Sequence, residues 1–473
     1  MQAASVRPNF LVLARGSALR RIVFVCFKAR GHIYAATALS RNLEKLGFDV
    51  SFVGAPSAKP IFDELGRDFK PMECLDLLAL PFGIERRPQK LRNGNVGGKL
   101  RKATKNARNE VTLLQSSFAK IRSELGSVID ELRPELAVFD PFLLLYSLPF
   151  QAKGVPVVTM CSMILATPDP IVPPLTEYLV PGMPLYRTRV RIAWLRQHIY
   201  YALWERWEKM MSGASLGDLV SRFGKVCGVD AAKSWRPRPI LFDARFDNCA
   251  EWVLHAREFD LPRMRELDHE VHFVGPVADL ERDERKADIS ASGRPIVFAA
   301  LSTVRNADPR LRRRILDVWL RLAKNRSDLF FVISADDHAE VLKPEQVPDN
   351  VQVFALAPSI EILRQASLVM TQAGANVVKE AIWHDVPLLL LPLRADQPGV
   401  AARVLFHGLG LAHPSLPSWQ RLSSDIDELM DDPIWKTRVI AMRKAFEGYD
   451  DLRALEIAVQ SALKGQLDTS KVV

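Results

Sequence analysis

The sequence predicts an α/β protein with two Rossmann-like domains, and three observations lead to this fold class. Residues 21–53 form a unit of buried strand, glycine turn, helix and second strand. A second unit of the same kind occupies residues 368–391. Between the two units, a charged segment that is poor in apolar residues follows Gly275, as is typical of a linker between domains. With 473 residues, the chain is long enough for two hydrophobic cores.

These observations divide the chain into five parts. We predict a mobile lead-in at 1–20, an N-terminal domain at 21–275, a linker at 276–293, a second domain at 294–445, and a C-terminal helix with its tail at 446–473.

The first unit begins with the apolar run RIVFVCF at residues 21–27, which is typical of a parallel strand buried on both faces. Gly31 and His32 follow in a turn. Apolar residues then recur at helical spacing over residues 33–46, before a second strand at 48–53. The rest of the chain continues the pattern. Further strands are predicted at 136–139, 155–160, 252–254, 271–274, 296–301, 329–334 and 351–354, and late helices at 433–446 and 450–463.

The second unit carries a possible anion site. A strand at 368–370 leads into the turn Gly374-Ala375-Asn376, and a helix follows at 377–383. The N-terminus of a helix offers unpaired backbone N–H groups and the positive end of a dipole to a phosphate. An ordinary glycine turn is the plain alternative for this motif taken by itself.

Three polar residues extend this site. Glu380 lies one helical turn beyond the glycine turn, within reach of a ribose. Asp396 and Gln397 follow the next strand, at 388–391, and therefore lie at the edge where open α/β sheets bind ligands. Each residue alone also fits a solvated helix carboxylate or a loop turn. Their joint order and spacing predict a nucleotide-sugar site.

Residues 368–404 resemble the donor-binding signature of the family 1 UDP-sugar glycosyltransferases, enzymes of the GT-B fold. The family pattern is His-x-Gly-x-Asn-Ser-x-x-Glu, then an apolar strand ending in Pro, then Asp-Gln. The matching residues are Gly374, Asn376, Glu380, Pro387, Pro392, Asp396 and Gln397. Two positions differ, because Gln372 replaces the diphosphate-binding His and Val377 replaces the Ser.

The resemblance implies two Rossmann-like domains that face each other across a cleft, with the C-terminal helix crossing back to the N-terminal domain. The N-terminal domain would bind the acceptor and the second domain the donor. His32 matches the family's catalytic base, which takes a proton from the acceptor hydroxyl, and Asp140 matches the carboxylate that orients it. The plain alternative is that His32 caps a helix and Asp140 begins a turn.

The resemblance also implies the donor contacts. Gln372, Gly374, Ala375 and Asn376 would hold the diphosphate, and Ser302-Thr303 correspond to a loop that approaches it. Pro358 stands where the family has a base-stacking Trp-x-Pro-Gln element. The Trp is absent here, so the base would rest on residues 355–356 or on Phe354.

Composition excludes several other classes. The five cysteines are scattered and lack metal-ligand spacing, which argues for a reducing compartment and against a zinc site. No apolar run approaches transmembrane length and no export signal is apparent, so we expect a cytoplasmic protein. The net charge is +9, and residues 86–108 carry nine Lys or Arg. Without a nucleic-acid motif, this charge favours solubility or an anionic membrane over nucleic acid.

Residues 186–211 mix Trp and Tyr with Arg, and they leave two interpretations open. Ile192, Leu195, Ile199 and Leu203 recur at helical spacing. They predict either an interfacial helix on the inner surface of an anionic membrane or a stripe that packs on the domain and lines an acceptor cleft. Both interpretations imply an apolar acceptor.

The sequence as a whole predicts an inverting, metal-independent transferase that moves a sugar from a UDP-sugar, or another nucleotide-diphosphate sugar, to a hydroxyl of an apolar or lipid-like acceptor. No Asp-x-Asp pair points to a metal-bound diphosphate. Three alternatives remain: a family 28-like glycosyltransferase for lipid-linked acceptors, a UDP-sugar 2-epimerase, and a catalytically silent nucleotide-sugar-binding protein.

Overall fold

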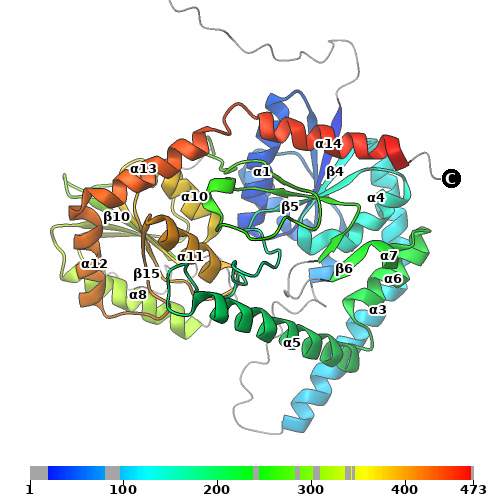
Figure 1. Ribbon diagram of the computed structural model, residues 1–473, viewed down its shortest axis with the longest axis horizontal. Helices are drawn as coiled ribbons and strands as arrows, with labels where there is room; N and C mark the ends of the chain where they lie inside the picture. The colour runs from blue at the N-terminus through cyan, green and yellow to red at the C-terminus, as the bar shows by residue number, and fades with distance from the viewer. Residues whose placement is uncertain are drawn as a thin grey trace, which may run out of the picture.

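The computed structural model describes residues 20–79, 96–237, 244–282, 288–301, 309–335, 342 and 347–469. Within them, two parallel sheets lie side by side, each flanked by helices (Figure 1). The predicted α/β fold class with two Rossmann-like domains is confirmed.

The N-terminal sheet has the strand order β3-β2-β1-β4-β5-β8-β9. Its strands are β1 (Arg21–Cys26), β2 (Asp49–Gly54), β3 (Phe69–Pro71), β4 (Leu136–Phe139), β5 (Val157–Cys161), β8 (Ala250–Val253) and β9 (Val271–Phe273). The helices of this half are α1 (Arg30–Lys45), α2 (Lys59–Glu64), α3 (Val96–Leu132), α4 (Leu148–Ala152), α5 (Tyr186–Ser212), α6 (Leu216–Cys227) and α7 (Ala231–Ser234). A small antiparallel pair, β6 (Trp235–Pro237) and β7 (Ala244–Phe246), completes it.

The C-terminal sheet has the strand order β12-β11-β10-β13-β14-β15. Its strands are β10 (Ile296–Ala300), β11 (Phe330–Ser334), β12 (Val351–Phe354), β13 (Ala366–Thr371), β14 (Leu388–Leu390) and β15 (Gly410–Ala412). The helices are α8 (Pro309–Lys324), α9 (Ser359–Leu363), α10 (Ala375–Trp383), α11 (Gln397–His407), α12 (Trp419–Asp431) and α13 (Pro433–Glu447). The strands are short and mostly apolar because helices cover both faces of the sheet (Figure 1).

The last helix, α14 (Arg453–Thr469), crosses back to the N-terminal sheet, as predicted (Figure 1). Leu455 and Val459 are buried in the same cluster as Phe24 of β1. The hydroxyl of Ser461 donates a hydrogen bond to Glu270, which precedes β9. The C-terminal end of the chain therefore stabilises the N-terminal domain.

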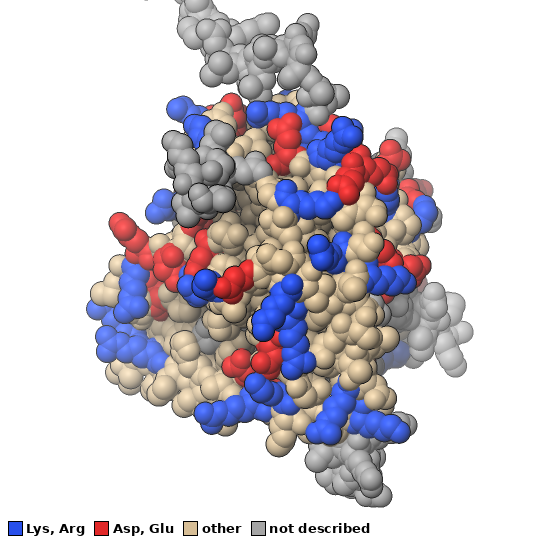
Figure 2. Space-filling view, turned by 90° about the vertical axis from the view of Figure 1, so that its right-hand side faces the viewer, with Lys and Arg blue, Asp and Glu red and all other residues tan. Residues whose placement is uncertain are grey.

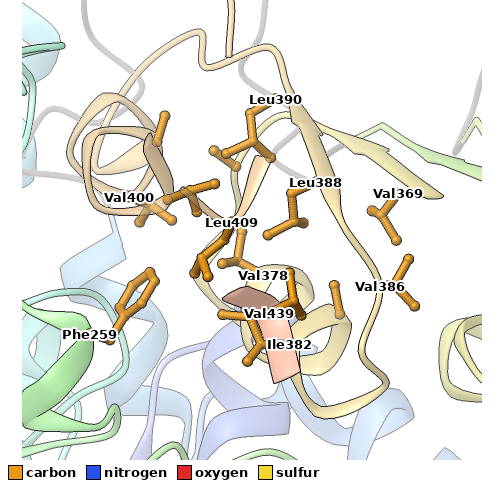
Figure 3. Packing of buried hydrophobic residues seen from close by; sticks show 14 of the residues in the cluster. Phe259, Val369, Val378, Ile382, Val386, Leu388, Leu390, Val400, Leu409 and Val439 are labelled. Carbon is orange, nitrogen blue, oxygen red and sulfur yellow. The ribbon is translucent and has the colours of Figure 1, made fainter. Parts of the chain in front are cut away.

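The core of the C-terminal domain is not built from that domain alone. Ile164, Leu175 and Trp194, which precede the linker in the chain, are buried in one cluster with the residues of β14 and α11. In Figure 3, Phe259 points from the N-terminal half toward Val400 of α11. The two halves thus share part of a hydrophobic core.

A buried ion pair reinforces this junction. Arg403 of α11 is fully buried, and its Nε donates to Asp260 at 2.9 Å. The Cβ that any larger residue would add at Gly399 would lie 2.8 Å from Ile164 and 2.9 Å from the carbonyl oxygen of Leu175. Glycine is therefore required at this close contact.

Candidate active site

His32 and Asp140 meet at the carboxyl edge of the N-terminal sheet. β1 and β4 are adjacent and parallel, with Val25 opposite Phe139, so the residues that follow these strands lie side by side. Nδ1 of His32 lies 2.6 Å from Oδ2 of Asp140. The Asp140 side chain is fully buried, whereas that of His32 is 17% exposed. The pair therefore leaves part of the imidazole accessible.

The sequence prediction put His32 in the turn before the helix, but α1 begins earlier, at Arg30. The N–H groups in the first turn of a helix need no intrahelical partner. Gly31 therefore lowers the stability of the helix only slightly at this position. His32 N and Ile33 N both bond to the carbonyl oxygen of Ala29. His32 is thus held in the first turn of a regular helix, which fixes its position more firmly than a loop would.

Asp140 has two tasks at once. Its Oδ1 accepts a hydrogen bond from Phe142 N at 3.0 Å and begins a short 3₁₀ helix, while Oδ2 faces His32. The His32 ring packs against the rings of Phe27 and Phe142. Burial lowers the pKa of His32, but the Asp140 carboxylate, and then the more distant Asp396, outweigh it and raise that pKa above its ordinary value.

The α10 turn faces this pair from the C-terminal domain. Gly374 is extended at the N-terminus of the helix, and no side chain caps it. The left-handed position that glycine usually takes falls on Ala373, at φ +61°. Among the described residues, and apart from its own neighbours in the chain, no atom lies within 4 Å of the Cβ position at Gly374, which leaves room there for a ligand at the first-turn N–H groups.

Asn376 joins the two turns. Its Nδ2 donates to the carbonyl oxygen of Gly31 at 2.8 Å, directly beside His32. The prediction gave this side chain to the diphosphate, whereas here it makes a contact between the domains. Gln372 lies buried at the end of β13. Of the predicted diphosphate contacts that lie in the described part of the chain, the backbone at Gly374 and Ala375 has room for a ligand.

Glu380 is buried beside a residue that the sequence analysis did not identify. Its Oε1 lies 3.1 Å from Nη1 of Arg282, which belongs to the linker. The Arg282 guanidinium also lies over the ring of Tyr34, 4.5 Å from its centre. A charged linker predicts some ion pair, but nothing in the sequence indicates that this arginine reaches α10.

The next residue, Lys379, is buried too, and it donates to the carbonyl oxygens of Leu254 and Val277. Burial, partly offset by the charge of Glu380, lowers the pKa of Lys379 to about 8. α10 is therefore tied to the start of the linker by its two buried charged residues.

Asp396 and Gln397 stand after β14, as predicted. Oε1 of Gln397 accepts hydrogen bonds from Leu393 N and Arg394 N, so this carbonyl folds the loop, and the amide nitrogen is its remaining donor group. Burial raises the pKa of Asp396 to about 6, although its own backbone N–H and the charge of His32 oppose that rise. Asp396 and His32, which belong to different domains, thus shift each other's pKa.

The remaining predicted donor residues follow β10 in the chain or lie near the start of α9. Ser302 and Thr303 lie outside the described residues. Pro358 is buried at the start of α9, and Phe354 is partly buried against the domain core. Residues 355–356, whose backbone is the other predicted platform for the base, are exposed.

The described part of the chain offers no metal site and no membrane span. No group of three or more His, Cys, Asp or Glu side chains there could hold a metal ion. No helix among these residues is long and apolar enough to cross a membrane. A cavity of 370 Å³ lies between α1, the linker and the α13–α14 junction, lined by Arg41, Asp279, Trp383 and Tyr449 among others. None of the predicted site residues lines it.

Comparisons with known proteins agree with this architecture. A model of the "UDP-glucoronosyl and UDP-glucosyl transferase" family matches residues 255–458. The zeaxanthin glucosyltransferase of Pseudescherichia vulneris is 22% identical over 453 residues, which cover 93% of this chain and 97% of that protein. The NDP-glycosyltransferase YjiC of Bacillus licheniformis is 22% identical over 432 residues, covering 90% of this chain and 93% of its own.

Solved structures share the whole fold. The glycosyltransferase of kitacinnamycin has a TM-score of 0.62 at 16% identity, covering 94% of this chain and all of that one. CalG4, the calicheamicin glycosyltransferase, has a TM-score of 0.59 at 16% identity, covering 95% of this chain and 99% of that one. Identities this low show the common fold.

Proposed function

Starting from a GT-B glycosyltransferase that resembles the family 1 UDP-glycosyltransferases, we propose that this chain transfers a sugar, with inversion, from a UDP-sugar or another nucleotide-diphosphate sugar. The acceptor is a hydroxyl of an apolar small molecule or lipid-like compound, and no metal ion takes part. The observation that carries the proposal is the His32–Asp140 pair, which faces the open N-terminus of α10 across the Asn376–Gly31 contact.

His32 acts as the general base. Because Nδ1–H donates to the Asp140 carboxylate, Nε2 keeps the lone pair that accepts the proton of the acceptor hydroxyl. The hydroxyl oxygen attacks the anomeric carbon as the bond from that carbon to the diphosphate oxygen breaks. The electron pair leaves with the nucleoside diphosphate, and the proton stays on His32. Asp140 orients the imidazole and stabilises its charged form.

The donor half holds the leaving group. The exposed backbone N–H groups of α10 and the helix dipole stabilise the negative charge that develops on the diphosphate. Glu380, with Arg282 beside it, binds the ribose end, and Asp396 with Gln397 binds the sugar hydroxyls. This division keeps the anomeric carbon between Gly374 and His32.

Two observations support an apolar acceptor. A relative that spans 93% of this chain is, by its name, a glucosyltransferase for zeaxanthin. The acceptor half also presents α5, whose outward face is apolar and basic. We propose that the chain works in the cytoplasm, in peripheral contact with the anionic inner surface of a membrane.

The test is release of the nucleotide by the full chain from UDP-glucose, UDP-GlcNAc and dTDP-glucose, with and without a panel of apolar alcohols. Release that depends on the acceptor and gives a product of inverted anomeric configuration supports the proposal. Three outcomes overturn it: isomerisation of the sugar without acceptor indicates an epimerase, transfer to lipid-linked saccharides alone indicates the family 28-like activity, and donor binding without turnover indicates a silent protein.

A further inference from the structure

The helix α5 is anchored along one side only. It runs along the lower edge of the molecule in Figure 1, below the region between the two sheets. Val190, Ala193 and Trp194 are buried on its inner side, and Trp194 donates a hydrogen bond to the carbonyl oxygen of Val172. Near its other end, the sulfur of Met211 accepts a hydrogen bond from Thr104 of α3. The orientation of α5 about its own axis is therefore fixed.

This orientation turns a row of large apolar side chains outward. Five of them are between 52% and 64% exposed: Ile192, Leu195, Ile199, Leu203 and Met210. Their spacings of three, four and seven residues place them on one face of the helix. Of the two interpretations that the sequence left open for residues 186–211, packing of this stripe on the domain is therefore wrong.

The same face is basic. Arg189, Arg196 and Arg206 are exposed among the apolar residues, and Arg196 pairs with Glu177 at its edge. All of α5 is described, and no Asp or Glu is among its exposed residues. The neighbouring α3 adds the exposed Lys105 and Arg108. Figure 2 shows Lys and Arg side chains gathered along the lower edge of one face, with uncharged residues between them.

The basic run noted at 86–108 lies mostly outside the described part of the chain. Residues 86–95 lie outside the described residues, and so do the side chains of residues 96–103. The surface is defined by α5 and by the two described α3 residues alone.

We propose that the outward face of α5 docks on an anionic lipid bilayer, with the helix axis parallel to the membrane plane. The five apolar side chains then enter the boundary between headgroups and acyl chains, Tyr200 and Trp207 lie at headgroup level, and the arginines meet lipid phosphates. Docking would bring an apolar acceptor from the bilayer to the enzyme. Only this consequence, and not the docking itself, rests on the proposed function.

The charge of the α5 face favours an anionic bilayer over a second copy of the chain as its partner. In a symmetric dimer through α5, the same face would meet itself, and arginines of one copy would approach arginines of the other. An anionic bilayer complements both the charge and the apolar row. Each well-placed basic residue should then strengthen binding about 5-fold at low salt.

The experiment is co-sedimentation of the full chain with vesicles of neutral phosphatidylcholine and with vesicles that also contain phosphatidylglycerol, at low and moderate salt. We expect sedimentation with the anionic vesicles only, weaker at moderate salt. The double variant Ile192→Glu/Leu203→Glu should lower partitioning at least about 10-fold, because it puts carboxylates into the docking face. Arg189→Gln should lower it about 5-fold.

The matched control is Ile457→Glu. Ile457 is 52% exposed on α14, which lies on the opposite side of the molecule from α5 in Figure 1. This variant should sediment like the unaltered chain. The proposal is overturned if the unaltered chain does not sediment, or if the double variant sediments equally well. It is also overturned if light scattering shows a dimer that the double variant dissociates.

Transfer to a detergent-dispersed acceptor without vesicles separates this inference from the proposed function. The double variant should keep that activity, because it alters no residue of the cleft. If the double variant loses vesicle binding but keeps transfer, the result supports both the membrane docking and the proposed function. Vesicle binding without any transfer by the unaltered chain refutes the catalytic proposal alone.

Discussion

The two turns that face each other across the cleft are built alike but work differently. At the β1–α1 turn, the reactive group is a side chain, His32, which a buried carboxylate holds. At the β13–α10 turn, the side chain of Asn376 is bonded to the protein, and the backbone near Gly374 is what remains open. A site made of backbone tolerates changes of side chain. This explains how Gln372 and Val377 can depart from the family pattern while His32 and Asp140 follow it.

The largest effect should come from the side-chain turn. We expect His32→Ala to lower the transfer rate about 100- to 10,000-fold, the range for loss of a general base. UDP binding should change no more than a few-fold, since His32 contacts the acceptor and the transition state. Steady-state kinetics and calorimetry measure the two quantities. Near-normal turnover in this variant would remove His32 from the mechanism.

A smaller loss, below about 100-fold, should follow Asp140→Asn. Asparagine can still accept the hydrogen bond from Phe142 N, so the turn persists. Asp140 contributes to the raised pKa of His32, so the variant should lower that pKa. The reaction needs neutral His32, and the rising acid limb of the pH–rate profile should therefore move to lower pH. An unmoved limb would leave Asp140 as a turn residue only.

The donor turn should respond in binding rather than in rate. Glu380→Gln should weaken UDP binding by about 1.5–3 kcal/mol, the worth of a charged hydrogen bond, and it should lower the thermal stability because Arg282 loses its buried partner. Asp396→Asn is the matched control, which should spare UDP and weaken the intact nucleotide sugar. A Glu380→Gln variant that is less stable but binds UDP normally would make Glu380 a structural partner of Arg282 alone.

The smallest effect should be a gain. Val377→Ser restores the hydroxyl that the family carries at the N-terminus of α10, and it should tighten UDP binding by about 0.5–1.5 kcal/mol. Val377→Ala removes a comparable part of the side chain without adding a donor, and it therefore serves as the control. Equal affinities of the two variants in calorimetry would show that the backbone alone binds the diphosphate.

Local pattern predicted much of this molecule. Two strands, β4 and β12, have the bounds that the sequence indicates, because each is a short, mainly apolar segment flanked by polar or turn residues. The likeness to solved GT-B structures and the return of α14 confirm the predicted architecture. The approach of Asp140 to His32 also follows from pattern, since adjacent parallel strands bring their following residues together.

Local sequence pattern does not predict contacts between segments that are distant in the chain. The spacing of the apolar residues in α5 indicates one face of a helix, yet it does not say whether that face meets protein or solvent. Arg282 reads as one charge in a charged linker, and its pairing with Glu380 depends on how the two domains meet. The engagement of Asn376 with Gly31 has the same origin.

The shared core has a consequence for engineering. A chimera that exchanges the N-terminal half with that of a relative would also exchange Ile164, Leu175 and Asp260, which pack on or pair with α11 of the other half. Recombination at the linker alone would then leave Arg403 buried without its carboxylate and Gly399 facing a foreign loop. Exchanges of acceptor specificity should therefore carry α11 together with the N-terminal half, so that both sides of this seam come from one parent.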